Sequence, residues 1–119
     1  MANTCMYGMT VDGEPRDIET LASYLKGEQE RKLFGVRSDE TYYGNHHGLH
    51  VINGGCKNTV ERSMLGTEYS YYHDADDKTP YTTLEQLSKE LNLRIDVQGV
   101  EEFRERFIIN KGVIEYEAD

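Results

Sequence analysis

The segment EPRDIETLASYLKG, residues 14–27, decides the fold because it predicts a helix with one buried face. Its apolar residues follow the i, i+3, i+4, i+7 spacing of such a helix: Ile18, Leu21, Ala22 and Leu25. Pro15 suits the first helical position, where the missing N–H removes no intrahelical hydrogen bond. Gly27 follows the apolar residues and can adopt the left-handed conformation in which many helices end. A helix of this kind needs an apolar surface to cover.

The segments before and after this helix predict strands. Residues 4–13 alternate, with the more apolar set at the odd positions, which predicts a half-buried strand. Short strands are predicted at 33–37 and 49–52, a turn at 53–55, and a further strand over 56–65 that continues after Gly66. The intervening connections are rich in glycine, asparagine and charged residues.

The last third of the chain repeats the pattern of a helix followed by strands. Residues 82–92 predict a second helix, in which Thr82 and Glu85 would form a capping box. The alternating segment 93–98 predicts a strand, and 103–117 predicts a hairpin around Asn110, Lys111 and Gly112.

The order of these elements predicts one α+β domain over residues 1–119. Two helices separated by strands suit a two-layer sandwich, with both helices on one face of an antiparallel sheet. The ferredoxin-like βαββαβ arrangement is the template, and the C-terminal β-hairpin would extend the edge of its sheet.

The charge of the chain disfavours nucleic acid as a direct partner. The formal net charge is −9, and residues 61–119 carry seven Lys/Arg against fourteen Asp/Glu. Such a surface repels phosphate and attracts basic partners. No apolar run is long enough to span a membrane or form a signal peptide, so we expect a cytoplasmic protein with no membrane contact. In a reducing compartment Cys5 and Cys56 would be free thiols, and a disulfide between them is the alternative.

The stretch YYGNHHGLH, residues 42–50, holds three of the four histidines. Imidazole nitrogens of His46, His47, His50 and, if the fold brings it close, His73 could bind Zn²⁺ or Ni²⁺. On one continuous strand His46 and His50 would share a face and His47 would lie on the other. Because the spacing matches no zinc signature, we predict a surface loop or strand edge, with no metal, no cofactor and no catalytic residue. A small metal-dependent enzyme using this loop is the alternative, as is a thiol enzyme using Cys56 or Cys5.

Tyrosines and carboxylates supply the candidate binding residues. Tyrosine combines apolar area with a polar tip and is enriched at interfaces. Acidic side chains of the 74–77 loop and of the last strands could dock against lysines and arginines. The predicted partner-binding residues are Tyr42, Tyr43, Tyr71, Tyr72, Asp74, Asp76, Asp77, Glu101, Glu102 and Glu105.

Both ends of the chain resemble a known family. The start, MANTCMYGMTVDGEPRDIETLASYL, is similar to small plasmid- and phage-encoded proteins with a YubB-type ferredoxin-like domain, with Asn3, Cys5, Val11 and Gly13 at matching positions. The end, LEQLSKELNLRIDVQGVEEFRERFIINKGVIEYE, resembles their closing helix, strand, bend and hairpin. The resemblance covers about residues 1–26 and 82–117 and implies a mobile genetic element as the source.

The resemblance and the charge together predict a non-enzymatic binding protein. It would inhibit a host-defence complex by protein–protein contact, as anti-CRISPR proteins do, and could occupy a nucleic-acid-binding surface there. The expected partner is a host protein or nucleoprotein complex with a basic surface. A homo-oligomeric structural protein, with tyrosines at a symmetric interface, is a further alternative, and a homodimer is compatible with either function.

Overall fold

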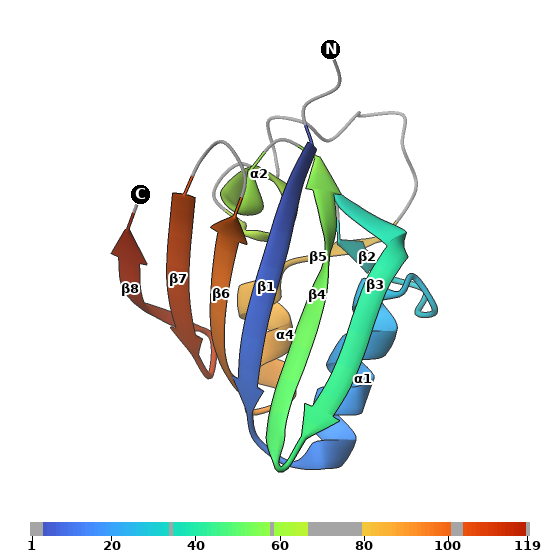
Figure 1. Cartoon of the computed structure of the whole chain (residues 1–119), viewed down its shortest axis with the longest axis vertical. Helices are drawn as coiled ribbons and strands as arrows, with labels where there is room; N and C mark the ends of the chain where they lie inside the picture. Colours follow the sequence, from blue (N-terminus) through green and yellow to red (C-terminus); the bar gives the residue numbers. More distant parts are fainter. Residues whose placement is uncertain (1–3, 34, 58, 67–79, 101–103, 119) are drawn as a thin grey trace.

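The computed structural model describes residues 4–33, 35–57, 59–66, 80–100 and 104–118. Most of them belong to one sheet with helices packed behind it (Figure 1). In chain order the elements are β1 (Thr4–Asp12), α1 (Pro15–Leu25), β2 (Lys32–Leu33), β3 (Val36–His46), β4 (Leu49–Lys57), α2 (Val60–Met64), β5 (Tyr81–Thr82), α4 (Leu84–Glu90), β6 (Arg94–Val100), β7 (Arg104–Asn110) and β8 (Val113–Ala118).

The sheet has six strands in the order β3-β4-β1-β6-β7-β8, and every neighbouring pair is antiparallel. β2 and β5 form a separate short parallel pair. Figure 1 shows α1 and α4 behind the same face of the six-stranded sheet, while no labelled helix lies in front of it. The expected α+β class and antiparallel sheet are therefore confirmed, with more strands than the four of the template.

The face toward the helices, which we call the covered face, carries the core. Alternation in each strand sends one set of residues to this face. In β1 these are Tyr7, Met9 and Val11, and each is almost fully buried. The apolar side chains of α1 pack on them as predicted, and α1 begins at Pro15. It ends in a Schellman motif, because Gly27 N donates to Tyr24 O and Glu28 N donates to Ser23 O.

The second predicted helix forms, but its cap is shifted by one residue. Thr83 is the N-cap, and its Oγ1 accepts from the backbone N–H of Gln86 at 3.2 Å. Thr82 is buried in β5 instead. Glu85 accepts from the N–H of Gly66 at 3.1 and 2.9 Å and takes no part in a capping box. Both threonines precede a Glu or Gln by three residues, so the sequence pattern alone did not distinguish them.

The middle of the chain differs most from the prediction. The turn expected at 53–55 is wrong, since β4 runs without interruption from Leu49 to Lys57. The strand expected over 56–65 is also wrong, because 60–64 is the helix α2 with Thr59 as its N-cap. Glycines suggested a turn because they usually mark one, whereas here they leave room for neighbouring side chains. The predicted continuation after residue 66 lies outside the described residues.

The expectation of two free thiols is wrong. Cys56 is fully buried and disulfide-bonded, and the sequence contains one other cysteine, Cys5. The register of β1 and β4 pairs the backbones of these two positions directly. Fifty residues of intervening chain hide this proximity in the sequence. Within the ranges that the structure describes, no helix is long and apolar enough to cross a membrane.

Candidate functional site

The histidine-rich stretch forms the hairpin between β3 and β4. His47 and Gly48 both have positive φ values, 56° and 88°, as a two-residue hairpin turn of type I′ requires. This turn pairs His46 with Leu49, so the side chains of these two residues share a face. His50 follows Leu49 and therefore points to the opposite face. The prediction that His46 and His50 share a face is wrong because the chain reverses between them.

One tyrosine–histidine pair of this hairpin lies on the covered face. Tyr43 Oη and His50 Nδ1 are 3.0 Å apart, and the two rings stack at 6.2 Å with an interplanar angle of 7°. His50 is only 8% exposed, and Tyr43 packs against the core. Desolvation raises the pKa of Tyr43, and the negative charge of Glu19 acts in the same direction. This pair belongs to the core.

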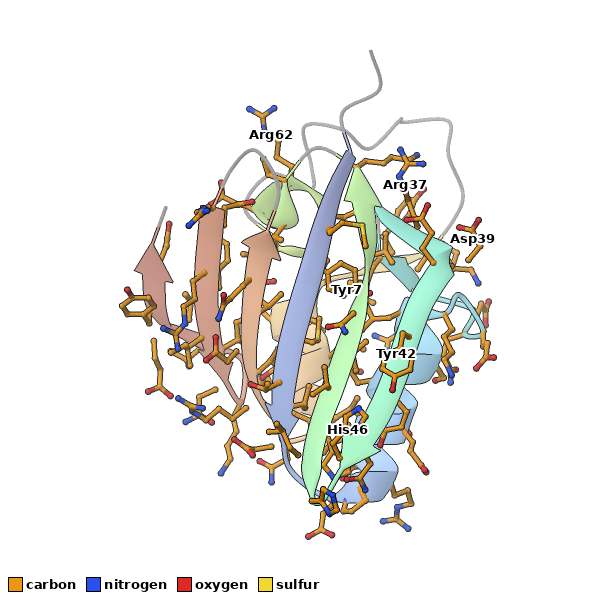
Figure 2. All side chains as sticks on the ribbon, viewed as in Figure 1. Tyr7, Arg37, Asp39, Tyr42, His46 and Arg62 are labelled. Atoms are coloured by element: carbon orange, nitrogen blue, oxygen red, sulfur yellow. The ribbon has the colours of Figure 1, made fainter. Side chains whose placement is uncertain are left out.

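A second tyrosine–histidine pair lies on the other side of the sheet, which we call the open face. Tyr42 Oη is 3.3 Å from His46 Nε2, and the ring centroids are 6.5 Å apart. Gly44 lies between them, and a Cβ there would come within 2.4 Å of Tyr42 Oη and 2.8 Å of His46 Nε2. The glycine thus allows two exposed rings to meet above the strand (Figure 2).

This geometry does not bring the metal or thiol candidates together. His46 and His50 lie on opposite faces, and His47 is in the exposed turn. Among the residues that the structure describes, no group of three His, Cys, Asp or Glu side chains could hold a metal ion. His73 is outside that part of the chain. Cys56 cannot act as a free thiol nucleophile because it is buried and disulfide-bonded.

The open face carries the exposed apolar side chains. The strand register places all the large hydrophobic residues that are substantially exposed in the described part of the chain on this face: Met6, Tyr42, Leu49, Val113 and Tyr116. They are spread over β1, β3, β4 and β8. Surface apolar residues are normal when they are scattered. The exposed large hydrophobic residues of the described part of the chain are thus restricted to one face of the sheet.

The same face carries an excess of positive charge, although the chain as a whole is acidic. Among the described residues, the register and one close contact place five cations on this face, Arg37, Lys57, Arg94, Arg104 and Arg106, and three anions, Asp12, Glu40 and Asp96; the exposed Asp39 and Glu115 lie at register shifts and are assigned to neither face. Five cations against three anions contrast with the formal net charge of −9 for the whole chain. On the described part of this face, the balance of the assigned charges is therefore opposite in sign to that of the chain.

Two of the five cations are paired on the open face. Arg106 binds Asp96 through two hydrogen bonds of 3.0 and 2.7 Å, and its guanidinium lies 5.5 Å from the ring centroid of Tyr116. This ion pair raises the pKa of Arg106. Arg94 makes a looser contact of 3.8 Å with Asp12. These pairs hold the side chains above β6 and β7 in place.

The other three cations, Arg37, Lys57 and Arg104, form no ion pair with any described residue. Arg37 also has a buried Nε with no hydrogen-bond acceptor among those residues. Its side chain and the Glu40 carboxylate both reach over Gly55, which leaves the space that they occupy. Figure 2 shows Arg37 at the end of the sheet where β4 finishes, with Asp39 beyond the outer edge of β3. Positive charge without a partner thus gathers at this end of the open face.

Three of the ten predicted binding residues are described. Tyr42 is 51% exposed on the open face. Tyr43 is half-buried on the covered face, and Glu105 accepts hydrogen bonds from the N–H groups of Val60 and Glu61 at the start of α2. The remaining seven lie outside the described residues. They are Tyr71, Tyr72, Asp74, Asp76, Asp77, Glu101 and Glu102.

Sequence reasoning missed most of the open face. Met6 alternates with buried residues of β1, so alternation could have identified it, whereas a register shift in β8 hides the position of Tyr116. The unpaired cations come from three strands, and only the strand order brings them to one surface. The chain matches no family model, no curated protein and no solved structure. The functional argument therefore rests on the geometry of the two faces.

Proposed function

We propose that the protein is a non-enzymatic binding protein that docks on another protein through the open face of its sheet. One observation carries this proposal: the exposed large apolar side chains of the described residues all lie on the face without helices. Tyr42 and Tyr116 are aromatic residues of the kind that supply binding energy at protein interfaces. Arg37 and Arg106 are of the other enriched type. Among the residues that the structure describes, no comparable cluster of reactive groups supports an enzymatic function.

We propose a ferredoxin-like core as the framework of this face. The strand order β3-β4-β1-β6, with α1 after β1 and α4 before β6, supports that assignment. The hairpin β7–β8 adds two strands beside β6 and widens the open face. The added strands bring Arg104, Arg106 and Tyr116, so the extension contributes much of the binding surface.

We propose inhibition of a host-defence complex as the biological role. The resemblance to plasmid- and phage-encoded proteins in the segments 1–26 and 82–117 supports this role. The acidic charge outside the open face would keep free nucleic acid away from the protein. That the acidic residues bind a basic protein or nucleoprotein complex stays a prediction. Seven acidic residues of the chain lie outside the described residues.

Affinity capture from host-cell extract tests the docking face. The protein is compared with Tyr42→Ser/Tyr116→Ser, which removes two exposed rings, and with the control Arg16→Ser/Lys26→Ser, whose exposed side chains lie on α1 and beside its end. We expect the wild type and the control to retain the same partner and the tyrosine variant to lose it by about tenfold or more. Equal retention by all three proteins would contradict the proposal.

A cytoplasmic location is part of the proposed role, and the disulfide of Cys56 provides its test. Disulfides persist mainly in oxidising compartments, whereas cytoplasmic thiols are kept reduced. Acid quenching of producing cells, followed by alkylation under denaturing conditions and mass spectrometry, reports the state of Cys56. A reduced thiol would fit the cytoplasm, and a disulfide under those conditions would argue for export.

A further inference from the structure

We infer that the open face binds an acidic segment of a protein, one that presents carboxylates beside apolar side chains. The inference rests on the proposed function and adds the chemistry of the partner. It concerns only the open face, where the charge is opposite to that of the whole chain. The net charge of −9 suggests a basic partner, but for the open face we infer an acidic partner instead.

Charge complementarity is the first argument. Arg37, Lys57 and Arg104 have no ion-pair partner among the described residues, and Arg37 Nε is buried without an acceptor. Guanidinium groups bind carboxylates through two parallel hydrogen bonds, so Arg37 and Arg104 are well suited to acidic side chains. The three cations at this end of the open face therefore have no ion-pair partner among the described residues.

The apolar side chains specify a protein partner over a nucleic acid. Met6, Leu49 and Val113 are exposed on the open face, and aliphatic side chains offer no platform on which a base could stack. A nucleic acid would also bring a phosphate backbone close to a chain of net charge −9. Two open faces brought together would oppose the same excess of positive charge, which disfavours a face-to-face pair of this chain. An acidic, partly apolar protein segment would contact both the unpaired cations and the exposed apolar side chains of the open face.

The dimensions of the face fit a single segment. Tyr42 on β3 and Tyr116 on β8 flank it, with four strands between them. At about 4.8 Å per strand, the flanking strands are about 24 Å apart. A helix about 10 Å wide, or an extended chain, fits between the two rings. Met6 lies between them on β1, and the unpaired cations lie where β4 ends and where β3 and β7 begin. The segment would thus place its carboxylates at that end, where Met6 pairs with Gly55 in the same row as Arg37, and its other apolar residues against the two rings.

Selection from a random peptide library displayed on phage tests this inference. The immobilised wild-type protein is the target, and Lys57→Glu/Arg104→Glu is used for counter-selection. Both side chains are exposed, so the substitutions leave the core unchanged. We expect the enriched peptides to carry net negative charge together with aromatic or aliphatic residues. A synthetic copy of the strongest peptide is then titrated by fluorescence polarisation.

The matched control is Arg16→Glu/Lys26→Glu, which changes the net charge by the same amount away from the open face. We expect about tenfold weaker binding to Lys57→Glu/Arg104→Glu and a change below about twofold in the control. Binding to the wild type should weaken as salt rises from about 50 mM to about 300 mM. Oligothymidylate should not compete with the peptide.

Other outcomes separate the two proposals. Peptides without an acidic bias, an equal loss in both charge variants, competition by oligothymidylate or the absence of any enriched peptide would overturn the inference. If Tyr42→Ser/Tyr116→Ser loses the captured partner while Lys57→Glu/Arg104→Glu keeps it, the acidic segment is wrong and the docking face survives. If all variants keep the captured partner, the docking face itself is wrong.

Discussion

The β3–β4 hairpin contains two tyrosine–histidine pairs that differ in which face of the sheet they occupy. Tyr43 and His50 stack under the helices, where His50 is 8% exposed. Tyr42 and His46 make a similar contact on the open face, where Tyr42 is 51% exposed. The residue types and the chain segment are the same. The comparison teaches that burial, set by the turn at His47 and Gly48, decides which pair stabilises the fold and which is available to a partner.

Alanine substitutions of two adjacent glycines, Gly54 and Gly55, test this comparison with the largest expected effect on stability. A Cβ on Gly54, on the covered face, would lie 2.6 Å from Tyr7 Oη and 2.9 Å from two carbons of the same buried ring. We expect Gly54→Ala to lower the free energy of unfolding by about 2–3 kcal/mol, because the packed ring cannot move away. Burial also raises the pKa of Tyr7 to about 12, with the Thr41 hydroxyl acting in the opposite direction. Urea denaturation measures the loss of stability.

The matched control is Gly55→Ala on the open face. A Cβ there would come within 2.0 Å of Glu40 Oε2, but that carboxylate is the end of an exposed, flexible side chain. We expect a change within about 0.5 kcal/mol. Equal losses for Gly54→Ala and Gly55→Ala would show that the two faces are not packed differently.

Truncation of the histidines should give the next largest difference. His50→Ala removes a buried ring and leaves Tyr43 Oη without its partner at 3.0 Å. We expect a loss of about 2 kcal/mol in the free energy of unfolding, from the cavity and the unpaired hydroxyl together. His46→Ala should cost less than about 0.5 kcal/mol, since its ring is exposed. Thermal melts of the two variants, compared in the same buffer, test the expected ranking.

Substitutions of one carboxylate on each face should give a smaller difference in stability. Glu105 holds the first turn of α2 through the N–H groups of Val60 and Glu61, at 2.9 and 3.3 Å. We expect Glu105→Gln to cost about 1 kcal/mol, because it removes the charge from hydrogen bonds at a helix N-terminus. Asp96→Asn breaks the exposed pair with Arg106 and should cost about 0.5 kcal/mol or less. Chemical denaturation that ranks Asp96→Asn above Glu105→Gln would contradict this assignment.

The sequence predicted the elements whose signals are local. The spacing of Ile18 and Leu21, the proline at position 15 and the hairpin at Lys111 and Gly112 all act within a few residues, and each is confirmed. The prediction for residues 53–65 was wrong because two glycines in this segment leave room for side chains from other strands. Gly54 leaves room for the ring of Tyr7, and Gly55 leaves room for the carboxylate of Glu40. Such a requirement arises from the pairing of β4 with β1 and β3.

The open face could be predicted from the sequence only in part. Tyr42 was predicted as a binding residue because tyrosine is enriched at protein interfaces. Tyr43 was included for the same reason, although it packs against the core. The cations Arg37, Lys57 and Arg104 were not identified, because the negative charge of the chain directed attention to its carboxylates. Net charge describes the whole surface, whereas the strand register decides what each face presents.

The ion pair on the outside of the helices should contribute less than the Glu105 hydrogen bonds, and pH provides the measurement. Arg31 binds Glu90 through hydrogen bonds of 3.1 and 2.7 Å, and Gln86 donates to the same carboxylate. These donors, Arg31 first, lower the pKa of Glu90 from 4.5 to about 2. A carboxyl whose pKa is lowered by folding stabilises the fold above its unfolded value. That stability should therefore be full above about pH 4.5 and lost as the pH falls toward about 2.

Since the side chains of this pair are 35% and 36% exposed, solvent screening limits the contribution to about 0.5–1 kcal/mol. Glu90→Gln keeps the shape of the side chain and removes its titration. We expect the variant to be less stable than the wild type at neutral pH and equally stable near pH 2. The difference between their free energies of unfolding should shrink across that window. A difference that stays constant with pH would mean that Glu90 contributes through packing alone. The Arg31–Glu90 ion pair would then add nothing to the stability of the fold.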